Sequence, residues 1–266
     1  KYSGNFNIRY ENLIDGERGL PEYSKSTIYN IRWTHSKDSK SSPYSSLSAS
    51  VNFGSSDYFR ESVNQLNTPN FLNNNLSSSI NYSKTIPGKA GIRLSMNASM
   101  SQNTQSKEVN LTLPTFTLNT ARFYPLAKEG GSKKGLFQNI NIQYSAKAEN
   151  RVILADSLLF KKGMFENAKN GMTHSIPITT NFKLFKHFSV SLGGNYNDVW
   201  ALKTKKYYDF NQKDGVVMEE VKGFDRFNQY NYSASVGTTI YGTVNFKPEN
   251  RIQSIRHTIK PNISYS

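Results

Sequence analysis

The stretch YNYSASVGTTIYGTVNF, residues 230–246, sets the expectation for the fold because its side chains alternate between two kinds. Apolar and aromatic residues occupy most even positions, whereas asparagine, serine and threonine occupy most odd ones. A period of two is that of a β-strand with two different faces. Strands of soluble domains run about 5 to 6 residues, whereas a tilted strand needs about 9 to 11 to cross a bilayer. Residues 230–246 therefore predict one continuous strand long enough to span a membrane.

The same alternation recurs along the chain and predicts about eleven strands, separated by turn signals such as Asp15-Gly16 and Pro87-Gly88. One predicted strand changes phase, because Leu111 and Leu113 lie on odd positions but Phe116 and Leu118 on even ones. A β-bulge at Pro114-Thr115 explains this slip. The predicted strands are residues 2–10, 27–35, 47–53, 76–82, 92–100, 109–118, 140–148, 172–184, 188–196, 230–246 and 255–265.

The connections between these strands differ in length in a regular way. Short ones follow the second, fourth, eighth and tenth strands, and long ones follow the first, third, seventh and ninth, including residues 150–171 and 200–227. The link 102–107 is short where the rule expects a long one, and 128–134 is intermediate. Short periplasmic turns that alternate with long outer loops are typical of outer-membrane barrels. We therefore expect an all-β, antiparallel transmembrane β-barrel wall whose first strand rises outward.

Composition excludes other classes. The chain of 266 residues is 36% hydrophobic with a mean hydropathy of −0.62, and no segment approaches the roughly 20 apolar residues of a membrane helix. A low mean hydropathy is compatible with a barrel, in which only every second strand residue faces lipid. A soluble β-sandwich also hides charge from one face, but strand length and loop alternation favour the barrel. Cysteine is absent, which excludes disulfides and thiolate metal sites.

A net charge of +14 raises the question of nucleic-acid binding, but the basic residues are dispersed and no RNA- or DNA-binding signature is present. Dispersed basic residues suit an anionic lipid or polysaccharide equally well. The apolar rows carry almost no charge, whereas the polar rows carry basic residues that we expect to face the lumen. These candidates are Arg9, Arg32, Arg93, Lys147, Lys183, Arg256 and Lys260.

Aromatic residues gather toward the predicted strand ends, where girdles at the two membrane interfaces would place them. Cross-strand packing in a soluble sheet is the alternative explanation. The candidate girdle residues are Tyr2, Tyr10, Trp33, Tyr82, Tyr196, Tyr230, Tyr232 and Tyr265.

Catalytic chemistry has no support in the sequence. His35, His174, His187 and His257 are scattered, and no HExxH, GxGxxG, P-loop or GxSxG motif occurs. We predict a protein that is not an enzyme and has no cofactor. Carboxylates in the long connections could bind a divalent cation, although solvated loop residues are the favoured interpretation.

Several strings resemble the outer-membrane lipopolysaccharide-assembly family LptD, in the version typical of Bacteroidota. Arg256-His257 before Pro261, together with the run SQNTQSKEVNLTLP, carries most of the likeness. The strings are IRWTH (31–35), SASVNFGSSDYF (48–59), SSSINYSK (77–84), SQNTQSKEVNLTLP (101–114), GMTHSIPITT (171–180), Gly223-Phe224, residues 230–246 and IRHTIKPNISYS (255–266).

The resemblance implies a very large barrel of about 26 strands that inserts lipopolysaccharide into the outer leaflet of the Gram-negative cell outer membrane. It also implies an LptE-like lipoprotein plug in the lumen, periplasmic lipopolysaccharide-bridge proteins and outer-membrane lipids as partners. Residues 1–266 would then be part of a single barrel domain, without the family's periplasmic jelly-roll domain, its remaining strands or its lateral gate. The alternatives are an outer-membrane channel or gated transporter for small solutes and, more distantly, a soluble carbohydrate-binding module.

Overall fold

The computed structural model describes residues 1–266 except 64–73, 129, 131–132, 134, 209–216 and 248–251. The described residues form strands with two short α-helices, α1 (Tyr58–Glu61) and α2 (Gly135–Gln138). The strands are β1 (Tyr2–Asp15), β2 (Ser24–Lys37), β3 (Ser45–Gly54), β4 (Asn75–Ile86), β5 (Ile92–Asn103), β6 (Glu108–Asn119), β7 (Asn141–Ile142), β8 (Ser145–Ala155), β9 (Lys169–Leu184), β10 (Phe188–Tyr208), β11 (Val217–Gly237), β12 (Ile240–Asn245), β13 (Ser254–Ile259) and β14 (Asn262–Tyr265).

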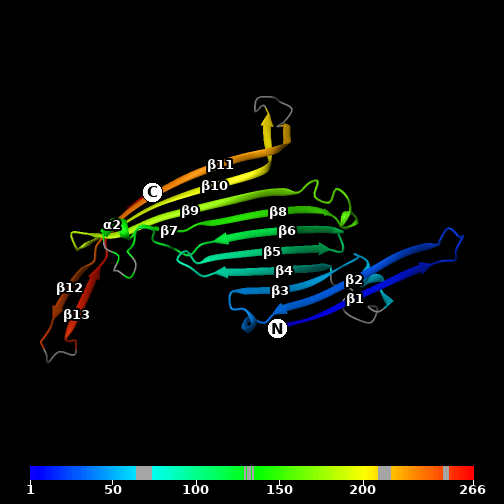
Figure 1. Ribbon diagram of the computed structural model, residues 1–266, viewed down its shortest axis with the longest axis horizontal. Coiled ribbons are helices and arrows are strands. Elements are labelled where there is room, and N and C mark those ends of the chain that lie inside the picture. Colours follow the sequence, from blue (N-terminus) through cyan, green and yellow to red (C-terminus); the bar gives the residue numbers. More distant parts are fainter. Residues whose placement is uncertain (64–73, 129, 131–132, 134, 209–216, 248–251) are drawn as a thin grey trace.

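Within the described part of the chain, one antiparallel sheet of twelve strands forms a single curved wall (Figure 1). Its order is β1-β2-β3-β4-β5-β6-β8-β9-β10-β11-β14, with β7 paired to β9. The sheet is open, because β1 and β14 do not pair with each other. The prediction of an all-β antiparallel architecture is therefore confirmed, and the strands pair in chain order as in a meander. None of the described helices is long and apolar enough to cross a membrane.

The sheet has two different faces across its whole width. Residues that pair directly across an antiparallel ladder lie on the same face, and an unbroken row of such pairs joins apolar side chains. We name this side the apolar face; the alternate residues, among them Asn7, Arg32, Asn97 and Ser191, form the polar face. The row runs through Leu47, Tyr82, Met96, Phe116, Ala148, Met172 and Trp200.

The same row shows that the strands are staggered. It begins at Leu47, close to the start of β3, and reaches Trp200 beyond the middle of β10. Such a progressive shift is what strands tilted against a barrel axis require. The wall therefore has the geometry of a barrel segment although the sheet is not closed.

The predicted phase slip in residues 109–118 is confirmed. The pairing of β6 with β8 moves from Thr112 to Thr115 while β8 moves only from Arg151 to Glu149, so Leu113 and Pro114 together face one residue, as in a bulge. Pro114 has no backbone N–H to donate, and a bulge is where a strand tolerates it. The bulge keeps Leu111 and Phe116 on the same, apolar face in spite of their different parity.

The prediction of one continuous strand over residues 230–246 is wrong. β11 ends at Gly237, and β12 pairs with β13 in a separate two-stranded sheet that projects from the wall (Figure 1). The partner strand is interrupted at the same level, where Thr238 N–H donates to the Pro261 carbonyl. Pro261 cannot donate in return, so both ladders break together. The pairing register is kept across this break, since Val236 pairs with Ile263 and Ile240 with Ile259, but Ile240 belongs to the separate hairpin and not to the wall.

The long connection predicted at residues 200–227 is also wrong, because β10 extends to Tyr208 and β11 begins at Val217. Beyond Ala201, β10 pairs with β11 but not with β9, and a register shift follows (Figure 1). With no third strand beside this hairpin, neither face needs apolar residues, and the alternation disappears. The predicted strand 140–148 is in turn divided into β7 and β8.

The connections between strands lie at the two ends of the wall. The β1–β2 and β8–β9 connections lie at one end, together with the end of β10 and the start of β11, and α2 with the β12–β13 hairpin lies at the other (Figure 1). We call the first the loop end. The link 120–144 lies at the opposite end and contains α2 and β7, so it is longer than the intermediate link that the sequence predicted.

Two segments pack on opposite faces at the loop end. On the polar face, Tyr58 and Phe59 of α1 are buried against Ile28 and Leu13. On the apolar face, residues 156–168, named here the β8–β9 loop, cover a cluster that includes Val109 and Leu154. A hydrogen bond from Ser56 Oγ to Asp156 Oδ2 joins the two segments.

Candidate functional site

The structure brings part of the predicted basic set together on one face. Of the seven candidates, Arg9, Arg32, Arg93, Lys147 and Lys183 lie on the polar face of the wall. Arg256 lies on β13 in the separate hairpin, where its guanidinium stacks on the Tyr241 ring at 4.3 Å. Lys260 lies in the link between β13 and β14, so its expected place on a strand is wrong.

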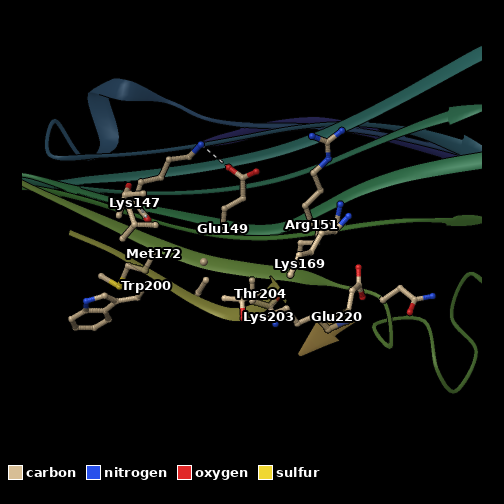
Figure 2. A pocket seen from close by; sticks show the side chains of 16 residues that line it. Lys147, Glu149, Arg151, Lys169, Met172, Trp200, Lys203, Thr204 and Glu220 are labelled. Carbon is tan, nitrogen blue, oxygen red and sulfur yellow. Dashed lines mark hydrogen bonds and ion pairs between the residues drawn. The ribbon is translucent and has the colours of Figure 1, made fainter. Parts of the chain in front are cut away.

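A basic cavity of about 510 Å³ opens on the polar face toward the loop end. β8 contributes Lys147, Glu149 and Arg151, which stand on one side of the strand because they alternate with Ala148 and Asn150 (Figure 2). Trp200 and Met172, which belong to the apolar face, extend to the other side of the strands (Figure 2). The charged residues that line this basic cavity are Lys147, Glu149, Arg151, Lys169, Lys203, Lys205 and Glu220.

Some of these charged side chains already have partners within the protein. Lys147 Nζ lies 2.6 Å from a carboxylate oxygen of Glu149 (Figure 2). Lys203 Nζ donates to the Glu166 carbonyl at 2.8 Å, and Arg151 Nε donates to the Asn110 amide oxygen at 3.2 Å.

Others are free to bind a ligand. Lys169 and Lys205 are exposed and have no ion-pair partner among the described residues. Arg151 uses Nε for Asn110, so its terminal guanidinium nitrogens retain donors. An ammonium gives a point charge for an anion, whereas a guanidinium can bind a phosphate through two parallel hydrogen bonds. The basic cavity can therefore hold a phosphorylated or carboxylated group without first breaking an ion pair.

Sequence reasoning found Lys147 but missed most of this cavity. Arg151, Lys169, Lys203 and Lys205 all fall in residues 150–171 or 200–227, which were predicted to be loops. A period of two does continue in Lys147, Glu149 and Arg151, and it could have extended the predicted strand. The approach of β8, β9 and β10 at this level depends on their pairing, which a single sequence does not give.

A second polar cavity, of about 330 Å³, lies between β1 and β2. It contains the predicted residues Arg9 and Arg32, together with Asn7 and Asn30. The Phe59 ring of α1 lies 5.9 Å from the Arg32 guanidinium carbon. This cavity therefore adjoins α1, some strands away from the basic cavity.

The candidate girdle residues belong to the apolar face or to strands that continue it. Tyr2 and Tyr82 lie near the end opposite the loop end, whereas Tyr10, Tyr196 and Tyr230 lie farther along their strands. Trp33 pairs with Phe6, and Tyr232 and Tyr265 flank Ala234. Their role as interface girdles stays a prediction.

The apolar face also carries an ion pair that the sequence did not predict. Asp198 is buried and accepts hydrogen bonds from Arg226 Nε at 2.9 Å and Trp200 Nε1 at 3.0 Å. Tyr196 donates to the same carboxylate at 3.1 Å and accepts from Arg226 Nη2 at 2.6 Å. A charge on this face is tolerated because the buried carboxylate accepts hydrogen bonds from Arg226, Trp200 and Tyr196. This arrangement is structural and leaves no acceptor for a ligand.

The part of the chain that the structure describes contains no candidate metal site. No three histidine or acidic side chains gather there as a metal would require. His174 accepts or donates a hydrogen bond at 2.7 Å with the Tyr144 hydroxyl, and His35 stacks on Tyr2 at 5.4 Å. Asp209 and Asp214 of the predicted acidic connections lie outside the described residues.

Comparison with known proteins agrees with the all-β fold. A search of curated proteins finds no match. The family model for the LptD protein, in contrast, matches residues 1–266, which is the whole chain. An antiparallel wall of tilted strands is the architecture that a β-barrel family requires. The chain therefore belongs to the LptD family, whose members act in lipopolysaccharide transport and assembly at the outer membrane of Gram-negative bacteria.

Proposed function

We propose that this chain forms part of the wall of an outer-membrane barrel that inserts lipopolysaccharide into the outer leaflet, with the polar face toward the lumen. The basic cavity between β8 and β10 carries the proposal. Lysines and an arginine with available donors converge there from three neighbouring strands. Lipopolysaccharide carries phosphates, and cations on the lumen side guide such a head group by electrostatic attraction.

The apolar face supports the same assignment. Large side chains such as Phe6, Ile8 and Val236 are exposed on it, although contiguous exposed apolar surface is rare on a soluble protein. A bilayer covers such a surface without further protein contacts. In this proposal an LptE-like lipoprotein occupies the lumen and periplasmic bridge proteins deliver the lipid, while the loop end faces outward.

The test reverses the two cations of the basic cavity that have no ion-pair partner. In the full-length protein, Lys169→Glu with Lys205→Glu should lower lipopolysaccharide at the cell surface about fivefold, since each exposed charge pair contributes a few tenths to about 1 kcal/mol. Surface lipopolysaccharide is measured by quantitative labelling of intact cells. Heat-modifiable migration and co-purification of the lipoprotein verify that the variant barrel is assembled.

Arg18→Glu with Lys25→Glu is the matched control. It changes the net charge equally, in the β1–β2 connection and at the start of β2, away from the basic cavity, and should leave surface lipopolysaccharide unchanged. Normal surface lipopolysaccharide in an assembled Lys169→Glu/Lys205→Glu protein would rule out the guiding role. A loss of small-solute permeability alone would favour a channel instead.

A further inference from the structure

The β8–β9 loop does not extend into solvent but lies back over the apolar face. Leu159 and Met164 pack on the cluster formed by β6 and β8, in which Val109 is fully buried. Phe160 reaches across to Phe53 of β3, with 6.0 Å between the ring centroids. The loop thus spans the wall from β8 to β3 on the side that the proposed function turns toward the membrane.

A groove of about 210 Å³ runs between this loop and the wall. Its floor is formed by β3 to β6, and its lining contains no charged side chain; the polar ones are Ser78, Ser79 and Ser99. Phe160 and Met164 overhang it from the loop. A channel lined mostly by apolar side chains and by no charged one suits a hydrocarbon chain.

Two lysines adjoin the overhang. Lys161 and Lys162 follow Phe160 directly and are exposed, and Phe160 itself is 73% exposed in spite of its contact with Phe53. Leu158 and Phe165 of the same loop are also exposed. Cations next to exposed aromatic and aliphatic side chains are the composition of a segment that binds at a charged lipid interface.

We propose that this groove, named here the outer-wall groove, binds an acyl chain of lipopolysaccharide while Lys161 and Lys162 bind its phosphates. The inference rests on the proposed function for one point, that the apolar face meets the outer leaflet at the loop end. Lipopolysaccharide combines acyl chains with phosphates in one molecule, which is the combination of chemistries that the groove and the two lysines offer together. The outer-wall groove lies on the face opposite the basic cavity and shares no lining residue with it.

The experiment reads out contact at one position of the groove. Ile80→p-benzoylphenylalanine in the full-length protein, purified in detergent, is photo-crosslinked to added lipopolysaccharide over a range of concentrations. Ile80 lines the groove and is 36% exposed. Val236→p-benzoylphenylalanine, on the apolar face but outside the groove, reports non-specific contact. We expect half-saturation at position 80 at a concentration about tenfold below that at position 236.

Two sets of variants test the two chemistries separately. Lys161→Glu with Lys162→Glu should raise the half-saturating concentration at position 80 about tenfold. The reason is that each cation near an anionic lipid adds to the binding free energy, and both cations are lost. Arg18→Glu with Lys25→Glu should not. Ala98→Trp, directly paired with Ile80, should fill the groove and abolish the crosslink, whereas Ala234→Trp should not.

The outcomes separate the proposals from each other. Equal crosslinking at positions 80 and 236, or no response to either groove variant, would overturn the outer-wall groove. Phosphatidylethanolamine that competes as well as lipopolysaccharide would overturn the choice of lipid. Lys169→Glu with Lys205→Glu should not affect the crosslink at position 80, so failure of the basic cavity to guide lipopolysaccharide would be recognised independently.

Discussion

Ser78 replaces a backbone partner at the point where β3 and β4 separate. Regular pairing of these strands ends at Ser50 with Ser79. Beyond it, Asn52 N–H donates to Ser78 Oγ at 3.0 Å, and Ser78 Oγ donates to the Asn52 carbonyl at 3.1 Å. The Ser78 hydroxyl thus pairs with both the N–H and the carbonyl of Asn52, which no longer has a backbone partner in β4. This pairing limits the separation of the two strands.

Ser78→Ala should speed hydrogen exchange of the Asn52 amide about fivefold, since a net hydrogen bond is worth about 1 kcal/mol. Exchange is followed by mass spectrometry on peptides that cover residues 50–54 in the detergent-solubilised full-length protein. Ser79→Ala is the control, because Ser79 pairs with Ser50 through its backbone. Equal exchange in both variants would show that the Ser78 hydroxyl does not hold β3.

Face assignments of single residues were largely predictable from the sequence, and contacts between distant residues were not. The alternation placed Val236 and Ser235 on opposite faces, as the pairing of β11 with β10 has them. It gave no indication that Asp198 meets Arg226, because both lie where the predicted pattern stops. An ion pair between a buried carboxylate and a half-exposed arginine on the apolar face depends on the register of two strands, which a period of two does not specify.

The β8–β9 loop stabilises the wall as an element because it buries one face of β8. Leu154 is 8% exposed beneath the loop, whereas its neighbour Ile153 is 52% exposed on the polar face. Leu154→Ala should cost about 2 to 5 kcal/mol of unfolding free energy. Ile153→Ala should change it by no more than about 0.5 kcal/mol. Urea unfolding of the full-length protein in micelles measures both, and similar losses would mean that the loop does not cover β8.

Element boundaries were the part of the fold that the sequence predicted least well, and the reason differs from place to place. Residues 230–246 keep their period of two through Gly237, but the break is imposed by Pro261 on the partner strand. β10 and β11 run beyond the predicted strand ends as a two-stranded hairpin, where both faces are solvated and no alternation is required. A period of two arises where one face of a strand is covered and the other is not. It therefore cannot predict a strand whose two faces are both exposed to solvent.

At the scale of the whole molecule, the wall predicts a strict pattern of chemical access. Ser191 lies on the polar face of β10 and Leu192 on the apolar face. With every other cysteine removed from the full-length protein, Ser191→Cys should react with a membrane-impermeant maleimide through the aqueous lumen. Leu192→Cys should react only after detergent is added, because lipid covers it. Equal labelling in intact membranes would exclude a barrel with this register.

The overall architecture could be predicted from the sequence, whereas the size and closure of the sheet could not. Alternation and turn signals are local properties, and they predicted an antiparallel meander with a bulge at Pro114. The short link 102–107 and the long link 120–144 depart from the expected alternation of connection lengths, yet the order of the strands is unaffected. Closure and strand number depend on stagger and on pairing partners, which are properties of the assembled sheet.

The hydrogen bond from Ser56 to Asp156 joins the two sides of this thin wall. Asp156 opens the β8–β9 loop on one side, and Ser56 precedes α1 on the other, where Lys107 and Asp57 add a contact at 3.4 Å. A lipid that displaces the loop must also perturb the segment that positions α1 beside Arg32. If breaking this bond shifts α1, reciprocity requires that a molecule bound against α1 changes the affinity of the outer side by the same factor. A single layer of strands can in this way transmit the state of the lumen to the surrounding leaflet.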